Sequence, residues 1–420
     1  MGLIPAQFLK GAFFSFVAAL LTGICGYLVR RFMANGCTTD EYAFFYSVFS
    51  LLSFCVIFIR LGMSDVVLFE LPRLLASGKY DQIGAVYRFI RRFQLIFSAV
   101  AYFLLIIAIP FLQRYYFDFP VNASNLAIYF LAIWGLVLET TAYFALNSLK
   151  KFKVLNVIRS LKSVLLLCSV LAGIYLHSFK IIIVSFVLIC SLCTLLGDRI
   201  ASRSLLLLHP LSQSGVAPKI LRSGLVFMML SGGYVLMSDA GTVALCFFSS
   251  AGEVVLFNIA LPIAMIVNAF DVVLQIFTPM FSEYFIHDEK KKLNQFFLLL
   301  SGATILCMIS VLPILYCRGE WLVKILFSER FVAAKFCTLF LVEASILAIP
   351  VKTFFHFFNA VGMKTVSAKV LIPVFGGALI FFPLLAYYRG ANGAGAATLV
   401  VVLIWLISYI FAYVRMRGNK

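Results

Sequence analysis

The sequence predicts an all-α polytopic membrane protein with about 12 transmembrane helices in two six-helix bundles. The chain is 63% hydrophobic and 12% charged, with a mean hydropathy of +1.05. Soluble domains carry roughly a quarter charged residues. The apolar residues form runs of about 18–24, the length of a helix that crosses a hydrocarbon core. Six such runs recur in the same rhythm in each half of the chain.

Helices are the expected spanning elements because backbone groups in lipid must form hydrogen bonds within the protein. In the first half the predicted spans cover residues 12–29, 42–59, 93–111, 126–146, 160–176 and 181–197. In the second half they cover residues 225–248, 254–277, 294–316, 332–356, 370–388 and 394–414. These spans define two predicted domains, residues 1–212 and residues 213–420, each a six-helix bundle.

The two halves form an internal repeat with an offset of about 212 positions. Landmark pairs under this offset are Glu41 with Glu253, Asn147 with Asn359, Tyr175 with Tyr387, and Arg203 with Arg415. An even number of spans per half means that both halves enter the membrane in the same direction. The sequence therefore predicts parallel repeats in a V-shaped arrangement, as in transporters whose substrate path lies between the repeats.

Basic residues set the predicted orientation in the membrane. Most of the 34 Lys and Arg residues lie at the two termini and in the connections that follow even-numbered spans. Clusters occur at residues 88–92, 150–153 and 290–292. Under the positive-inside rule both termini are cytoplasmic. The net charge of +17 then reflects topology and not a nucleic-acid-binding face, so no nucleic-acid partner is expected.

The connections between spans disfavour an enzyme. The longest outer connections, residues 112–126 and 317–331, are about 15 residues long. They leave no room for the large outer loop with which membrane enzymes hold polyprenyl-linked acceptors. No phosphate-binding loop, dinucleotide-binding turn or nucleophile elbow occurs, and the four histidines lack a metal-ligand spacing. We expect no enzymatic activity, cofactor or metal. The connection 60–92 is predicted to contain a short amphipathic helix.

Charged residues inside spans are the first candidates for function, because each is costly in lipid and therefore faces a partner or a wet cavity. The candidates are Glu139, Asp239, Asp271, Glu343 and Lys352. The repeat offset places Glu139 on the position immediately before Lys352. We hypothesise that these two side chains face the cleft between the bundles and bracket the substrate. The alternative is that each is paired within its own bundle.

Three acidic residues are candidates for ion coupling. Asp239 lies midway along a span rich in small and polar residues. This composition favours a helix that lines a water-filled space or packs closely against a neighbouring helix. It could carry a coupling proton or cation, or serve as a hydrogen-bonded structural aspartate. Asp271 and Glu343 are grouped with it as ion-coupling candidates. Arg30 and Arg31 end the first span and are candidates for substrate binding, with interface anchoring as the alternative.

Short motifs in the first half resemble a known transporter family. Residues 37–49 read Cys-Thr-Thr-Asp-Glu-Tyr-Ala-Phe-Phe-Tyr-Ser-Val-Phe and follow the basic end of the first span. This pattern resembles the opening of polysaccharide-transporter proteins, the O-antigen-type flippase branch of the MOP (MATE-like) exporter superfamily. Residues 61–65 (Leu-Gly-Met-Ser-Asp) and 74–81 (Leu-Leu-Ala-Ser-Gly-Lys-Tyr-Asp) are similar to the family's LGL…LAxGDY stretch.

The second half carries looser matches to the same family. The segment 252–282, from Gly252-Glu253-Val254 to Pro279-Met280-Phe281-Ser282, resembles the family's G-x-V-G-x-Y…P-x-x-S segment. Phe257 stands where the family has Tyr, and Val255 where it has Gly. Residues 390–396 resemble its G-x-x-G-A-A entry to the last span, and Asp239 stands where the family often has an acidic residue.

The resemblance implies a MATE-like fold and a bacterial inner-membrane flippase. Its substrate would be an undecaprenyl-pyrophosphate-linked oligosaccharide for O-antigen, capsule or a similar polysaccharide, moved from the cytoplasmic to the periplasmic leaflet. Lys352, Arg30 and Arg31 would hold the pyrophosphate, and other polysaccharide assembly proteins are possible partners. The alternatives are a MATE-type antiporter for drugs or small cations, a lipid II flippase and a membrane repeat-unit polymerase.

Overall fold

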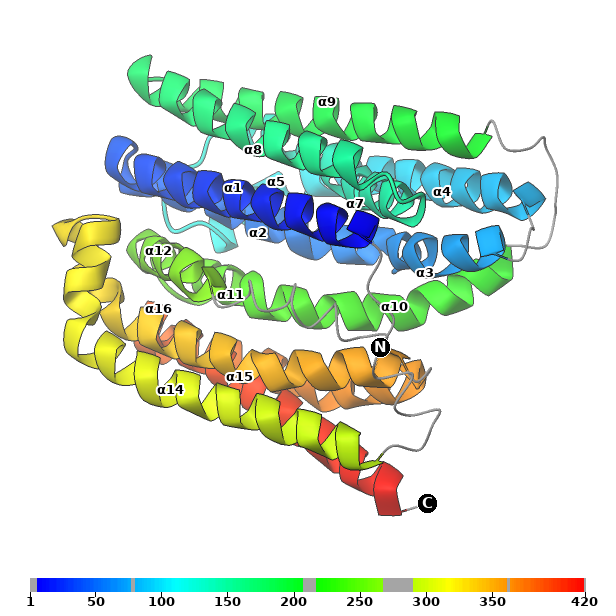
Figure 1. Ribbon diagram of the computed structural model, residues 1–420. Coiled ribbons are helices and arrows are strands. Elements are labelled where there is room, and N and C mark those ends of the chain that lie inside the picture. Colours follow the sequence, from blue (N-terminus) through cyan, green and yellow to red (C-terminus); the bar gives the residue numbers. More distant parts are fainter. Residues whose placement is uncertain (1–5, 77–79, 207–216, 267–289, 361–362, 419–420) are drawn as a thin grey trace. The chain divides into compact units, whose positions relative to one another are not determined.

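The fold is seen in a computed structural model that describes residues 6–76, 80–206, 217–266, 290–360 and 363–418 (Figure 1). Within these ranges every regular element is a helix. This confirms the prediction of an all-α polytopic membrane fold. Contacts group the chain into two compact units, residues 1–231 and residues 232–420. The predicted domain boundary at residues 212 and 213 stays a prediction.

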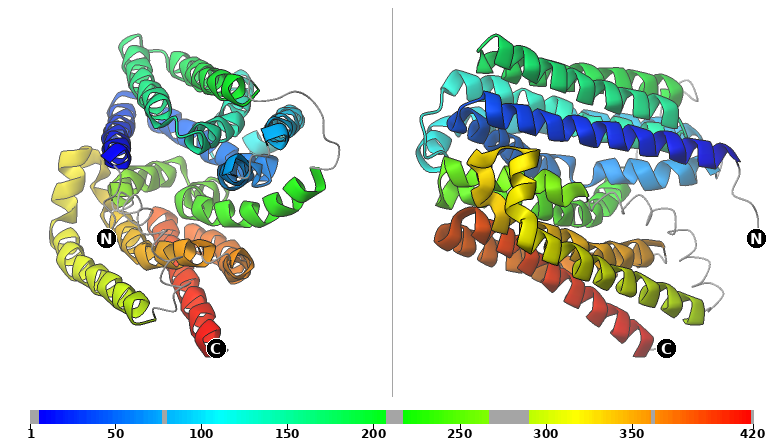
Figure 2. Two further views of the ribbon diagram at one scale, coloured as in Figure 1. Left: turned by 45° about the vertical axis from the view of Figure 1, so that its right-hand side comes forward. Right: turned by 60° about the vertical axis from the view of Figure 1, so that its left-hand side comes forward.

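The N-terminal unit is a bundle of helices that ends in the first part of α10. Its elements are α1 (Ala6–Gly36), α2 (Thr39–Arg60), α3 (Met63–Ala76), α4 (Tyr80–Ile107), α5 (Ile109–Tyr115), α6 (Ala123–Phe130), α7 (Ala132–Ser148), α8 (Phe152–Tyr175), α9 (Phe179–Leu206) and α10 (Ala217–Ser238). Helix α1 packs along α8, and α7 packs along α9 (Figure 2).

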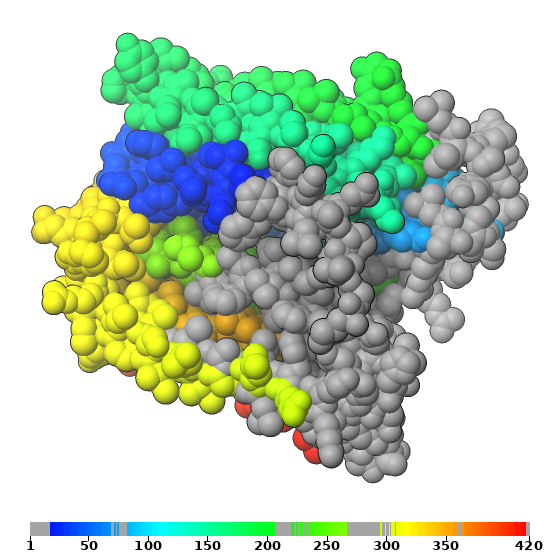
Figure 3. Space-filling view, viewed as in Figure 1, coloured from blue at the N-terminus to red at the C-terminus, as the bar shows by residue number. Residues whose placement is uncertain are grey.

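The C-terminal unit contains the end of α10 and the helices that follow it. These are α11 (Ala240–Phe248), α12 (Ala251–Met265), α14 (Lys290–Leu326), the short 3-10 helix η2 (Glu329–Ala334), α15 (Lys335–Ala360) and α16 (Lys364–Gly418). Helix α15 packs against α16, α14 and α12. Apolar side chains of α14 such as Leu306, Ile309 and Ile314 are exposed. Part of the surface of this helix is shown in yellow in Figure 3. This is the surface expected of a helix that faces lipid.

The predicted spans fall on helices throughout the described part of the chain. Nine helical stretches there are long and apolar enough to cross a membrane. One of them, Thr365–Met416, is long enough for the two last predicted spans. Its backbone is non-helical at Gly390, which separates the two spans. The predicted span 225–248 corresponds to α10 and α11, and the span 254–277 begins with α12. Residues 267–277 of that span lie outside the described residues.

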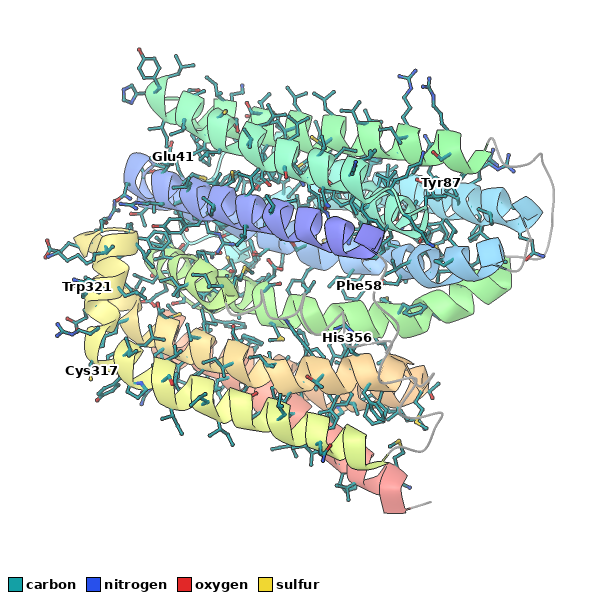
Figure 4. The ribbon with its side chains drawn as sticks, viewed as in Figure 1. Glu41, Phe58, Tyr87, Cys317, Trp321 and His356 are labelled. Carbon is teal, nitrogen blue, oxygen red and sulfur yellow. The ribbon has the colours of Figure 1, made fainter. Side chains whose placement is uncertain are left out.

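Local sequence explains how α2 begins and ends. Thr38 and Glu41 form a capping box, in which each side chain accepts a hydrogen bond from the other residue's backbone N–H. Glu41 is labelled in Figure 4. At the other end Leu61 and Gly62 both have positive φ angles, 45° and 65°. A Cβ on Gly62 would lie 2.1 Å from the carbonyl oxygen of Gly224 in α10, so only glycine allows this close approach.

The connection 60–92 contains the short helix that the sequence predicts. Helix α3 packs on α7, and its residues Met63, Val67 and Leu71 are fully buried. Helix α4 begins at Tyr80, well before the predicted start of the span at residue 93. The reason is that the basic residues at 88–92 are part of the helix, whereas the apolar run that marks the span begins only after them.

Candidate functional site

A cavity of about 230 Å³ lies inside the C-terminal unit among helices α10, α12, α15 and α16. Polar groups on its lining come from Ser238, Ser345, Lys352 and Thr398. The rest of the lining is apolar and includes Leu261, Met265 and Leu341. Lys352 is 8% exposed, so a cationic side chain is buried in a cavity whose walls are mainly hydrocarbon.

The sequence favours a gap at this place for two reasons. Helices α12 and α15 pack together, and each contains a proline, Pro262 and Pro350. A proline removes one helical hydrogen bond and permits a bend, which keeps neighbouring helices from packing evenly. Small side chains at Ala264, Ala344 and Ser345 then leave space at the centre. Lys352 follows Pro350 by two positions and lies on the cavity wall.

The polar part of the wall places hydroxyl groups in the same cavity as Lys352. Thr398 Oγ1 donates a hydrogen bond to the Ala394 carbonyl, 3.0 Å away, which fixes the hydroxyl's orientation. Ser238 Oγ donates to Asp239 Oδ2 at 2.6 Å. The Asp239 carboxylate is therefore hydrogen-bonded to a side chain that lines the cavity. A cavity that is lined by a buried ammonium and by hydroxyl groups can bind an anionic group such as a phosphate.

The three ion-coupling candidates have different positions. Asp239 is half-buried at the junction of α10 and α11. Glu343 is half-buried on α15, nine residues before Lys352, which corresponds to about 14 Å along a helix. Glu343 is therefore separated from the end of the cavity that holds Lys352. Asp271 lies outside the described residues.

Glu139 forms an ion pair within the N-terminal unit. The Lys162 Nζ atom lies 2.6 Å from Glu139 Oε2 and 2.8 Å from Oε1. The two side chains are 14% and 16% exposed. The Arg159 guanidinium lies over the Tyr143 ring, 4.9 Å from its centroid, one helical turn from Glu139 on α7. Helices α7 and α8 thus share a charged cluster of one carboxylate and two cations.

The sequence interpretation missed Lys162 and Arg159. Lys162 falls only three residues inside its predicted span, where a basic side chain is usually an interface anchor. The sequence feature that could have pointed to Lys162 and Arg159 is Glu139, because an acidic residue within a span predicts a cation on a neighbouring span. Glu139 and Lys352 belong to different units, and their direct coupling stays a prediction.

Arg30 and Arg31 contact tyrosines of the first two helices. The Arg30 guanidinium lies 4.9 Å from the centroid of the Tyr46 ring. Arg31 Nη1 donates a hydrogen bond to the Tyr27 hydroxyl at 3.3 Å. Both arginines are half-buried. These contacts fit interface anchoring, and substrate binding by either arginine stays a prediction.

Two further polar clusters connect helices of the N-terminal unit. Ser64, Gln94 and Thr141 form a buried hydrogen-bonded triad between α3, α4 and α7, with distances of 2.7–3.2 Å. At the other cluster the Tyr87 hydroxyl donates to Asp198 at 2.9 Å, and Arg91 lies 3.1 Å from the same carboxylate. Figure 4 labels Tyr87, which lies near the start of α4. Apart from the buried Arg91 Nε, which has no hydrogen-bond partner among the described residues, the groups named here bond to one another, and this indicates a structural role.

Comparisons with known proteins show where else this fold occurs. No family model matches the chain. The structure is similar to the lipid II flippase MurJ in an inward closed conformation, with a TM-score of 0.74, 14% identity, and coverage of 96% of this chain and 87% of that one. It is also similar to an inward-facing multidrug resistance MATE transporter of the MOP superfamily, with a TM-score of 0.71, 14% identity, and coverage of 97% and 98%.

A sequence relative is an uncharacterized membrane protein of Methanocaldococcus jannaschii. It is 24% identical over 431 residues, which cover 96% of this chain and 82% of the relative. The chain therefore has the polytopic fold that MurJ and MATE transporters share, and a membrane-protein relative of comparable length.

Proposed function

We propose that the protein is a flippase for a polyprenyl-pyrophosphate-linked oligosaccharide. The observation that carries the proposal is Lys352, a cation buried on the wall of a cavity within the membrane-spanning part of the chain. A buried ammonium is costly in lipid unless it faces a partner or a wet cavity. A pyrophosphate carries negative charge and several acceptor oxygens, so it is a ligand that a cavity lined by an ammonium and hydroxyl groups can bind.

The chemistry of such a substrate fits a helical transporter without a large outer domain. A charged head group and a sugar chain cannot cross hydrocarbon unaided, whereas a polyprenyl tail can remain in the lipid. The similarity to MurJ supports a lipid-linked substrate, because that protein is a lipid II flippase. The motifs at residues 37–49 and 74–81 favour an oligosaccharide repeat unit of O-antigen, capsule or a similar polysaccharide over lipid II.

The proposal includes a location and a direction. The basic connections favour cytoplasmic termini, and the resemblance of the sequence motifs to O-antigen-type flippases favours a bacterial inner membrane. Alternating access between the two repeats would move the substrate from the cytoplasmic to the periplasmic leaflet. Other polysaccharide assembly proteins are proposed as partners, since they would supply the lipid-linked unit and use it afterwards.

A second candidate function is antiport of small organic cations, as in MATE transporters. It is favoured by Asp239, whose carboxylate accepts a hydrogen bond from the cavity-lining Ser238. A carboxylate at this position could bind a cation or a proton. The buried ammonium of Lys352 on the same cavity would repel a cationic substrate, which is why we place the flippase first.

Deletion of the gene in its native host tests the proposal. Polyprenyl-linked sugars are extracted and surface polysaccharide is measured. We expect single lipid-linked repeat units to accumulate on the cytoplasmic side and surface polysaccharide to be lost. Accumulation of the same units in the periplasmic leaflet would indicate a polymerase. Unchanged lipid-linked sugars combined with increased sensitivity to cationic drugs would indicate the antiporter.

A further inference from the structure

A second cavity of about 800 Å³ lies in the C-terminal unit between the two arms of α16. Gly390, with φ 53° and ψ −135°, interrupts this helix and separates the arms. Residues 366–373 of the first arm and 407–416 of the second line the same cavity. The arms therefore lie side by side and antiparallel, with the cavity as a groove near their free ends. We call it the α16 groove.

The walls of the α16 groove are apolar, and its charged residues are cations. Val370, Pro373, Ile407 and Phe411 form much of the wall. Phe411 is 68% exposed and Ile407 63% exposed, which is expected of side chains that face lipid. The charged groups among the described lining residues are Lys369 and Arg415.

Both cations lie at the same end of the groove. Lys369 lies five residues after the start of α16, and Arg415 lies three residues before its end. Because the arms are antiparallel and these residues lie 21 and 25 residues from Gly390, both belong to the end of the hairpin opposite Gly390. Both side chains are exposed. An ammonium and a guanidinium at one end of an apolar groove are complementary to a phosphate group attached to a hydrocarbon chain.

The length of the groove decides which lipid fits. Ile407 and Arg415 are eight residues apart, which corresponds to about 12 Å of helix. A hydrocarbon core is about 30 Å thick, so the groove extends over one leaflet only. A cargo that crosses the membrane needs a path through both leaflets. A resident lipid needs only a phosphate site at the surface and an apolar wall below it.

We propose that the α16 groove binds an anionic phospholipid of the leaflet next to the C-terminus. Its phosphate lies between Lys369 and Arg415, and one acyl chain lies against Val370, Ile407 and Phe411. Basic pockets between transmembrane helices bind anionic head groups in this way. This site is distinct from the Lys352 cavity, and the inference does not depend on the transported substrate.

Native mass spectrometry of the purified full-length protein tests this inference, with phosphatidylglycerol and phosphatidylcholine as probes of equal chain length. We expect the wild type to retain phosphatidylglycerol selectively. The double variant Lys369→Gln/Arg415→Gln is expected to bind it about 30-fold more weakly, at about 1 kcal/mol per cation. Arg203→Gln, which removes an exposed arginine at the end of α9, is the control and should bind as the wild type does.

A second pair of variants tests the groove itself. Ala412→Trp and the milder Ser408→Leu fill the groove and keep both cations, so they should also lose the bound phospholipid. Equal retention of the two probes by the wild type would overturn the proposal, as would unchanged binding in the double variant or in both groove-filling variants. Tighter binding of a polyprenyl phosphate, in competition with phosphatidylglycerol, would assign the groove to the cargo tail and also overturn it.

Discussion

At the scale of single residues, the N-terminal unit contains an ion pair between Glu139 and Lys162. One sequence-based hypothesis pairs Glu139 with the distant Lys352, and the alternative is a partner within its own bundle. In the structure a carboxylate oxygen of Glu139 lies 2.6 Å from Lys162 Nζ on the neighbouring helix. Both side chains are largely removed from solvent. In such surroundings an ion pair contributes little net stability, but the loss of one member leaves an uncompensated charge.

A double-mutant cycle measures which lysine is coupled to Glu139. We expect Glu139→Gln to lower the free energy of unfolding by about 3 kcal/mol, because Lys162 then lacks its counter-charge. The double variant Glu139→Gln/Lys162→Met should recover most of that loss. Thermal unfolding in detergent provides the measurement. The same cycle with Lys352→Met serves as the comparison, and a larger coupling to Lys352 than to Lys162 would contradict our interpretation of the ion pair.

The Cys37 thiol lies between the first two spans and reports on local electrostatics. Burial, followed by the nearby Glu41 carboxylate, raises the pKa of Cys37 to about 12. Both effects disfavour the thiolate, which is the form that reacts with maleimides. With the other nine cysteines replaced, the labelling rate should increase about tenfold per pH unit from pH 7 to about pH 11.

The control for this measurement is Glu41→Gln, which can retain the capping box but removes the negative charge. Loss of that charge should lower the pKa of Cys37 and speed labelling at a given pH. A labelling rate that levels off near pH 8 or 9, as for an ordinary cysteine, would show that the thiol is not buried as described.

At the scale of helices, the repeat places two glutamates at equivalent positions with different partners. Glu41 accepts a hydrogen bond from the Thr38 N–H, at the start of its own helix α2. Glu253 accepts one from the Ala391 N–H, 2.6 Å away, at the start of the second arm of α16. Each carboxylate therefore caps a helix N-terminus, where the helix dipole favours a negative charge. The offset of about 212 positions predicts the pair, but a sequence does not show which backbone N–H Glu253 binds.

Gly390 makes the turn in α16 possible, and its replacement should be costly. A Cβ at this position would lie 2.4 Å from Glu253 Oε2, and the φ of 53° is unfavourable for other residues. We expect Gly390→Ala to lower the free energy of unfolding by about 2–3 kcal/mol. Gly376→Ala is the control, because a Cβ there meets no atom within 4 Å. The comparison uses thermal unfolding in detergent. Equal stability of the two variants would contradict the requirement for glycine at position 390.

Hydropathy predicted the helices well, but it predicted their ends and contacts less well. The apolar runs located the spans, because the length and composition of a membrane helix are set by the bilayer. They did not locate the start of α4 at Tyr80, since the first turns of that helix are polar. The candidate residues Glu139 and Lys352 were found because charges in spans are rare. Their neighbours Lys162 and Ser238 come from other helices, and one sequence contains no direct record of such contacts.

For the whole molecule, the predicted orientation leads to a labelling experiment. If both termini are cytoplasmic, Cys37 lies on the outer side and the end of α9 on the inner side. In spheroplasts at alkaline pH, a membrane-impermeant maleimide should label a protein that retains only Cys37. It should not label a cysteine-free protein with Arg203→Cys until the membrane is permeabilised. The reverse pattern would invert the topology and with it the proposed direction of transport.

The most direct test of the proposed function is translocation by the purified protein in liposomes. A lipid-linked oligosaccharide with a pyrophosphate linkage is added to one leaflet, and its appearance in the other is measured with an impermeant sugar-modifying enzyme. We expect translocation by the wild type, about 10–100-fold slower translocation by Lys352→Gln, and substantial recovery by Lys352→Arg, because a charge-assisted hydrogen bond contributes about 1.5–3 kcal/mol. Translocation no faster than in protein-free liposomes, or equal rates for the wild type and Lys352→Gln, would contradict the central role of the Lys352 cavity.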